Sequence, residues 1–190
     1  RERNLRTGVY DKKILCAECD NEVIGQYESY LSSLLFGGPI GKNEIPVCKD
    51  YIDLNGNEFS EFSNVPCKKL KIGLLSILWR AAISERDFFK KVKLADSYRE
   101  QLRQMIKNGD FKEISDFPFV LITYRNDSTM PIDMIFPPGD FHHQKGSGFV
   151  FIIGGLIILF YISHSFTEQE LFKYTCTPNN KIKVIKIKEG

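Results

Sequence analysis

Fourteen consecutive apolar or glycine residues, Phe149 to Ile162, constrain the fold of this chain more than any other stretch. A helix that spans a bilayer needs about 20 apolar residues, so this run is too short to cross one. It is rich in β-branched and aromatic residues, and Gly154-Gly155 at its centre supplies the two positive-φ positions of a tight turn. We therefore predict a buried β-hairpin and no membrane partner.

Four further stretches have the composition of strands. They are rich in β-branched and aromatic residues and are bounded by Asn, Pro or Gly: Phe117–Tyr124, Met134–Phe136, Leu171–Thr175 and Lys181–Lys188. Because the connections are short, we expect an antiparallel meander of about five or six strands. In 181–188 lysines alternate with Ile and Val, which is typical of an edge strand protected by charge, with a bulge at Val184-Ile185.

Helical periodicity dominates the first half of the chain. Apolar residues recur at helical spacing from Asp20 to Phe36, where Asp20 or Asn21 can cap the first turn and Gly37-Gly38-Pro39 ends the helix. Residues 68–84 are apolar on nearly every side, as in a buried central helix. Arg80 inside that helix needs a partner, and a structural ion pair is the favoured role.

Two shorter helices are expected next, over Ser84–Leu94 and over residues 96–108. Ser97 and Glu100 have capping-box spacing, and Asn108-Gly109 provides a C-terminal stop. Residues 37–66 are polar and rich in Gly, Asn and Pro, so we treat them as a variable connector in which Asn55-Gly56 suits a hairpin turn.

The fold class predicted from these elements is α+β. A C-x-x-C turn and helix (1–36) precede the connector (37–66), and the remainder (67–190) forms a helical layer followed by the antiparallel sheet. We expect the first and last of these parts to pack as one compact unit, because 190 residues suffice for a single sizeable core.

Composition limits the class of partner. The hydrophobic and charged fractions, 43% and 26%, are ordinary for a soluble globular protein, and a net charge of +2 does not by itself predict a nucleic-acid partner. A local basic patch would be needed, and the densest basic stretch is N-terminal: Arg1, Arg3, Arg6, Lys12 and Lys13. These residues either contact phosphates or form a solvated leader.

The cysteines indicate a reduced, cytoplasmic chain. There are five, an odd number at irregular spacing, and no signal peptide precedes them. Cys16 and Cys19 form a C-x-x-C turn on which two thiolates can converge on one zinc ion, which is half of a tetrahedral site. Cys48 and Cys67 either complete that site or are buried thiols.

Catalytic motifs are scarce. His142 and His143 are adjacent, so on a strand they would point to opposite faces, and His164 stands alone. The chain contains no G-x-S-x-G, P-loop, H-E-x-x-H or G-x-G-x-x-G sequence.

Three stretches stand out together: the string GVYDKKILCAECDN at 8–21, YESY at 27–30 and LSILWR at 75–80. In their order and spacing they resemble a family of uncharacterised bacterial proteins described as HNH-endonuclease-like, which are built on a treble-clef zinc knuckle. In that family a first C-x-x-C and a Ser-His-Ile-Ile-Pro-like motif precede the part that corresponds to Arg1. The resemblance implies that an N-terminal part is missing here, that Cys16 and Cys19 are zinc ligands, and that any catalytic part lies upstream of Arg1.

The sequence thus leads to two functional hypotheses. The first is an HNH-like zinc-knuckle protein that binds or cleaves nucleic acid in bacterial defence, with an endonuclease activity located upstream. The second is a non-catalytic protein-interaction or scaffold domain, with structural cysteines and a protein partner or a homo-oligomer. An upstream C-x-x-C with a nearby histidine would distinguish the first from the second.

Overall fold

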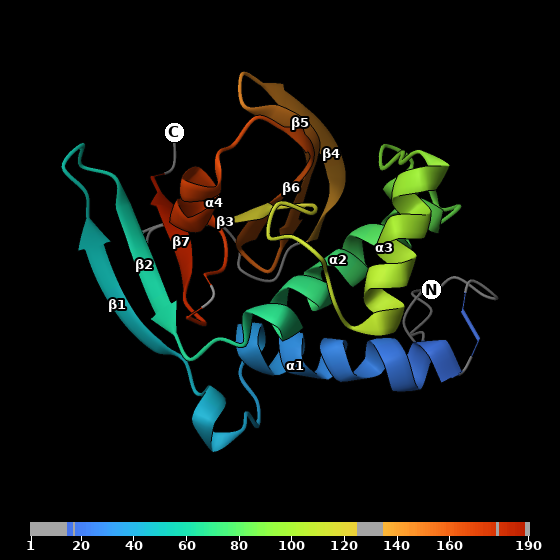
Figure 1. Ribbon diagram of the computed structural model, residues 1–190, viewed down its shortest axis with the longest axis horizontal. Coiled ribbons are helices and arrows are strands. Elements are labelled where there is room, and N and C mark those ends of the chain that lie inside the picture. Colours follow the sequence, from blue (N-terminus) through green and yellow to red (C-terminus); the bar gives the residue numbers. More distant parts are fainter. Residues whose placement is uncertain (1–14, 17, 125–134, 178, 189–190) are drawn as a thin grey trace, which may run out of the picture.

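The protein has an α+β fold, as predicted, in which most of the helices lie on one side of a large mixed sheet (Figure 1). The computed structural model describes residues 15–16, 18–124, 135–177 and 179–188. Within these residues every helix is too short or too polar to cross a bilayer. Figure 1 shows α1 (Gly25–Phe36), α2 (Cys67–Ile83) and α3 (Asp96–Asn108) grouped on one side of the molecule, with the hairpin of β1 (Val47–Ile52) and β2 (Glu58–Ser63) at its opposite end.

In the described residues seven strands form one sheet in the order β1-β2-β7-β3-β6-β5-β4. The strands are β1 Val47–Ile52, β2 Glu58–Ser63, β3 Phe119–Tyr124, β4 Ile135–His143, β5 Gly146–Ile153, β6 Leu156–His164 and β7 Ile182–Ile187. The sheet is not the simple meander expected, because β7 pairs parallel with β3 and antiparallel with β2. The last strand is therefore central rather than an edge strand, and its register passes Val184 and Ile185 without a bulge.

The apolar run that was predicted as a hairpin forms β5 and β6. Gly154 and Gly155 make the turn with φ of 59° and 76°, values that favour glycine. Aromatic side chains of the two strands meet in the core, where Phe151 and Phe160 pack edge to face with ring centroids 5.3 Å apart. The hairpin prediction is confirmed.

The connector also contains a hairpin. β1 and β2 pair antiparallel from Val47↔Ser63 to Ile52↔Glu58. The loop between them is longer than the two-residue turn that Asn55-Gly56 suggested, because the Asp53 carboxylate closes it. Asp53 Oδ1 accepts the amide N–H groups of Asn55 and Asn57 at 2.9 and 2.8 Å, and Gly56 adopts φ 79°. Residues 42–44 form a short 3₁₀ turn before β1.

The first helix begins with a π-helical turn, Cys19–Ile24, and continues as α1, Gly25–Phe36. Neither Asp20 nor Asn21 caps it: the N-cap position is occupied by Glu18, whose side chain makes no capping hydrogen bond. Gly37 ends it with φ 81°, as expected. Helix α2, Cys67–Ile83, is buried along its length, and its Arg80 guanidinium is ion-paired with Glu28 of α1, which confirms the structural role predicted for this arginine.

Helix α3, Asp96–Asn108, ends at Gly109, which adopts the left-handed conformation of a C-cap. Ser97 does not cap it, since Ala95 occupies the N-cap position. The helix expected over Ser84–Leu94 is wrong: only a short 3₁₀ turn, Asp87–Phe89, forms there.

The secondary structure predicted for the segment after β6 is also wrong. Leu171–Thr175 was expected to be a strand, but Glu168–Tyr174 is a helix, α4. Thr167 and Glu170 form a capping box at its start: Thr167 Oγ1 accepts from the Glu170 amide, and the Glu170 carboxylate accepts from the Thr167 amide at 2.8 Å. This local signal outweighs the β-propensity of the residues that follow.

The hydrophobic core lies between the helices and one face of the sheet. Among its fully buried side chains are Leu74 and Leu78 of α2, Leu102 of α3, Phe119 of β3 and Phe160 of β6. Successive residues of a strand point to opposite faces, so Val120 and Tyr161 face away from this core, on the side where α4 packs against β3 and β7.

Candidate functional site

Cys16 and Cys19 lie on an exposed turn at the start of the π-helical segment. The Cys19 amide donates to Cys16 Sγ (N···S 3.4 Å), and the Asp20 amide donates to Cys16 O at 3.0 Å. The bond from the Cys19 amide lowers the pKa of the Cys16 thiol, whereas a proton shared with Cys16 raises the pKa of the Cys19 thiol. The turn thus brings two sulfurs together, and one of them is stabilised as a thiolate.

The two cysteines border a hollow of about 250 Å³. Its lining combines apolar and basic side chains from three helices: Leu15, Cys16, Cys19, Val23, Ile24, Trp79, Arg103, Ile106 and Lys107. Arg103 and Lys107 are one turn apart on α3, and Arg103 donates two hydrogen bonds of 2.7 Å to Glu100. The hydrogen bond with Cys16 outweighs the positive charge of Lys107, so the pKa of the Cys19 thiol stays raised. The C-x-x-C turn is therefore located beside two cations that sequence reasoning had not associated with it.

Cys16 and Cys19 offer two thiols, half the number of ligands that a structural zinc site needs. Two neighbouring thiols suit zinc, which binds four ligands in structural sites. Among the described residues, no three His, Cys, Asp or Glu side chains gather closely enough to hold a metal ion. All five cysteines and three histidines of this sequence are among the described residues. A third thiolate or imidazole ligand for the same ion would therefore have to come from outside this sequence.

The other cysteines do not complete the site. Cys48 was expected to be buried if it was not a ligand, but it is exposed on β1. Cys67 is buried at the start of α2, as expected, and packs against Cys176, whose Sγ is 3.9 Å from the Cys67 carbonyl oxygen. Burial raises the pKa of the Cys176 thiol. This pair is part of the core, not of a metal site with Cys16 and Cys19.

The basic residues predicted to contact nucleic acid, Arg1, Arg3, Arg6, Lys12 and Lys13, lie outside the described residues. The histidines do not converge. His143 Nε2 is 2.8 Å from the Tyr161 hydroxyl, His164 Nε2 is 3.1 Å from Ser115 O, and His142 is exposed. Each of the two bonded imidazoles is used in a local structural contact.

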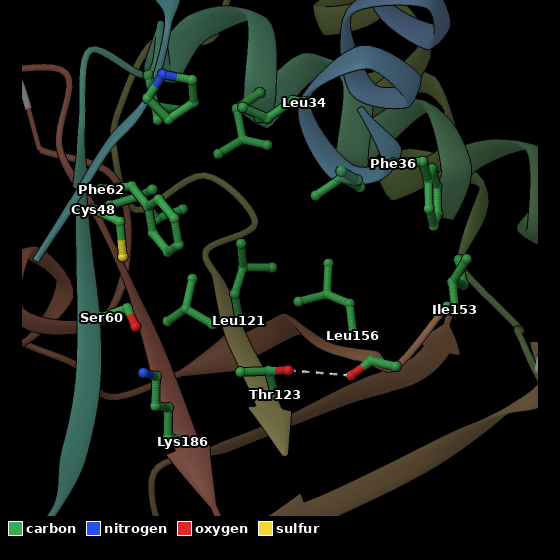
Figure 2. Close-up of a pocket in the computed structure, with 18 of the residues that line it drawn as sticks. Leu34, Phe36, Cys48, Ser60, Phe62, Leu121, Thr123, Ile153, Leu156 and Lys186 are labelled. Atoms are coloured by element: carbon green, nitrogen blue, oxygen red, sulfur yellow. Dashed lines mark hydrogen bonds between the residues drawn. The ribbon is translucent and has the colours of Figure 1, made fainter. Parts of the chain in front are cut away.

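A larger pocket lies on the helical side of the sheet, beyond the C-terminal end of α1 (Figure 2). It encloses about 530 Å³, and we call it the sheet pocket. It is lined by Leu34, Leu35, Phe36, Pro46, Cys48, Asp50, Ser60, Phe62, Val65, Leu70, Leu121, Thr123, Ile153, Gly154, Gly155, Leu156, Ile182, Val184 and Lys186. Most of these side chains are apolar, and they come from α1, α2, six strands and the loops beside them.

One end of the sheet pocket is polar, and we define this polar end as Asp50, Ser60, Thr123 and Lys186. Asp50 Oδ1 accepts hydrogen bonds from Ser60 Oγ at 2.6 Å and from Lys186 Nζ at 2.8 Å. These two bonds, with that from Lys186 the stronger influence, lower the pKa of the Asp50 carboxyl. Figure 2 shows Ser60, Thr123 and Lys186 at the same end, with Leu34, Phe36 and Ile153 at the other.

Sequence reasoning missed the polar end because its members are far apart in the chain. Asp50 and Lys186 are separated by 136 residues, and they meet only because β2 pairs with both β1 and β7. An Asp within a strand pattern and a Lys among alternating lysines are the only local signals. Neither indicates a site before the strand order is known.

We compared the whole chain with known proteins. No family model, no curated protein and no solved structure matches it.

Proposed function

We propose that this chain is a zinc-knuckle protein of the HNH-like type that binds nucleic acid beside its C-x-x-C turn. The observation that carries the proposal is the placement of two exposed, neighbouring thiols next to Arg103 and Lys107. Zinc would be held by Cys16 and Cys19 together with ligands from outside the described residues, and it would fix the turn as a structural ion. The two cations would contact phosphates.

Nucleic-acid binding is tested by fluorescence anisotropy with a labelled DNA duplex over a range of salt concentrations. The double variant Arg103→Ala/Lys107→Ala should bind about tenfold more weakly near 0.1 M salt and should flatten the salt dependence by about one unit per lost contact. The matched control, Lys49→Ala/Lys188→Ala, removes the same charge at exposed positions away from the hollow. Equal losses in the two variants, or no DNA binding by the native protein, would refute the proposal.

The zinc part has a separate test, metal analysis of the protein translated from the complete gene. We expect about one equivalent of zinc, and Cys16→Ser should release it and unfold the turn locally, because structural zinc contributes folding free energy directly. Cys48→Ser is the control, since Cys48 is also exposed but lines a different pocket. Zinc that survives the loss of Cys16 would exclude these two residues as ligands.

A second candidate, a protein-interaction domain, is favoured by the edge strand β1. It lies at one end of the sheet, all its residues are exposed, and Tyr51, Ile52 and Leu54 are exposed apolar residues at its C-terminal end. An exposed apolar edge can pair with another strand. Analytical ultracentrifugation of the native protein and of Ile52→Lys tests this candidate: a dimer that the added charge dissociates supports it, and a monomer in both excludes self-association through β1.

A further inference from the structure

We propose that the sheet pocket is a binding site for a small amphipathic monocarboxylate, such as a medium-chain fatty acid. The pocket has the features of a ligand site. Its volume of about 530 Å³ is in the range of small-molecule pockets, and its mostly apolar lining carries a few convergent polar groups at one end. An elongated ligand with one polar head matches that division.

The apolar part of the pocket would hold the tail. Leu34 and Phe36 at the end of α1 face Leu121 of β3 and Leu156 of β6 across the pocket (Figure 2). Phe36 is 61% exposed although it is large and apolar, so a tail lying against it would remove apolar surface from water. Among the described lining residues no polar side chain divides this part of the pocket, which suits a flexible aliphatic chain better than a polar ring.

Lys186 would hold the head. Among the described lining residues Lys186 is the one with a positive charge, and its side chain is 16% exposed. Its ammonium group has three N–H donors. One donor serves Asp50, which is 67% exposed and stands at the rim. A ligand carboxylate can accept a hydrogen bond from a second donor of Lys186, whereas the Thr123 hydroxyl at the same end of the pocket donates to the Gly155 carbonyl oxygen at 3.5 Å. The incoming charge then meets a partly desolvated cation, where a charge-assisted hydrogen bond is strong.

The same arrangement disfavours other heads. A phosphate would bring about two negative charges close to Asp50, and a single lysine cannot compensate both. A neutral alcohol would forgo the charge-assisted bond to Lys186. An amine would compete with Lys186 for the Asp50 carboxylate and face a cation of the same sign. A single carboxylate is therefore the head that fits this end best.

Isothermal titration of the native protein with decanoate, decanol and decylamine tests the choice of head group. These probes share one tail length and differ in head charge. We expect decanoate to bind about tenfold more tightly than decanol, and decylamine to bind most weakly. Tighter binding of decylamine, or equal binding of all three, would overturn the proposal.

Two substitutions at the polar end should act in opposite directions. Lys186→Met keeps the side-chain length and should weaken decanoate binding about tenfold, whereas Asp50→Asn removes a competing anion and should strengthen it severalfold. Lys183→Met is the matched control, because Lys183 is on the same strand but its ammonium lies over the Phe59 ring, 4.7 Å from the ring centroid, and does not line the pocket. Should Lys186→Met fail to fold, the Asp50→Asn result decides alone: weaker or unchanged binding contradicts the proposal.

The position of the ligand has its own readout, because Cys48 lines the pocket and is exposed to reagents. Decanoate should slow alkylation of Cys48 by iodoacetamide, measured by peptide mass spectrometry, and should leave Cys16 and Cys19 unaffected, since these two line the other hollow. Leu156→Trp, which fills the pocket, should abolish both the protection and the calorimetric signal. Binding that leaves Cys48 unprotected, or that persists in Leu156→Trp, would locate the ligand elsewhere and refute this site.

Discussion

Lys71 carries a charge into the core: among the residues that the structure describes it is a charged residue with only 1% of its surface exposed. Its ammonium donates to the carbonyl oxygen of Ile114 at 2.9 Å and lies 4.1 Å from the centroid of the Phe111 ring. These contacts stabilise the charge only in part, and burial lowers the pKa of Lys71 from 10.5 to about 8. The folded protein therefore holds this proton less tightly than the unfolded chain does.

This shift predicts a pH dependence of stability. Below pH 8 Lys71 is protonated in both the folded and the unfolded state, so the cost of burying its charge is fully present. From pH 8 to about 10.5 the unfolded chain binds more protons than the folded protein, so stability rises with pH. Urea denaturation of the wild type, compared with Lys71→Met, should show a relative gain of about 2 kcal/mol between pH 7 and pH 9.5. A constant difference between the two proteins over this range would show that Lys71 is not desolvated as described.

The close approach of the backbone at Gly148 predicts that a side chain at this position lowers the stability of the fold. It lies where the register of β5 and β6 shifts, and a Cβ atom there would come within 1.8 Å of the Phe160 carbonyl oxygen. Because that atom is backbone and cannot rotate away, Gly148→Ala should destabilise the fold by about 3 kcal/mol or more, measured by urea denaturation. Gly139→Ala is the control: its Cβ would lie 3.3 Å from a Val150 methyl group, which can adjust. Similar losses in both variants would contradict this explanation.

At the scale of single elements, α4 depends on its first residues. The capping box joins Thr167 and Glu170, and Lys145 donates to the Glu170 carboxylate at 2.7 Å. The lysine bond, followed by the Thr167 amide, lowers the pKa of Glu170 to about 2, so the cap should hold from neutral pH down to strong acid.

Thr167→Ala should therefore cost about 1 kcal/mol and increase hydrogen exchange at the amides of α4. Ser165→Ala, two residues earlier on an exposed position, should change neither quantity by much. Exchange rates in α4 that stay at the wild-type level would indicate that packing on the sheet, and not the cap, fixes this helix.

The same elements show what sequence can predict. Helix α2 and the Gly154-Gly155 hairpin were predictable because one stretch of chain contains all the information: an apolar surface all round, or two glycines between apolar runs. Helix α4 was also signalled locally by Thr167 and Glu170, but the short apolar segment after it suggested a strand. The position of β7 was not predictable, because its lysines are compensated by Glu61 and Asp50 from a distant hairpin.

In the candidate sites, too, local features could be predicted from the sequence and features that depend on the fold could not. The adjacency of Cys16 and Cys19 is a local property that their spacing predicts, whereas the nearby Arg103 and Lys107 depend on how α3 packs. The polar end of the sheet pocket joins four strands and has no local signature. Chemistry that is assembled by strand order becomes visible only with the fold.

For the whole molecule, β7 is the element on which the sheet depends. It joins the hairpin of β1 and β2 to the strands β3–β6, with Ile185 opposite Phe59 on one side and Ile122 on the other. Ion pairs of Lys181 with Glu61 and of Lys186 with Asp50 add to that connection. Interrupting β7 should therefore affect parts of the chain that are far apart in sequence.

Ile185→Pro should lower stability by about 3 kcal/mol or more and remove the hydrogen-exchange protection of β1 and β2, because proline cannot donate to the ladder of a central strand. Val47→Pro is the comparison: it introduces the same residue at the first position of an edge strand, where proline is tolerated. If the hairpin keeps its protection in Ile185→Pro, β7 does not hold it in place.

The central position of β7 also has a consequence for synthesis. Of the described strands β7 is the last to leave the ribosome, so β1 and β2 emerge long before the strand that attaches them to the sheet. An isolated hairpin is marginally stable in water, and this one exposes Tyr51, Ile52 and Leu54. During that interval the nascent hairpin is a target for chaperones and for aggregation. The yield of folded protein should therefore depend on how fast residues 64–187 are translated.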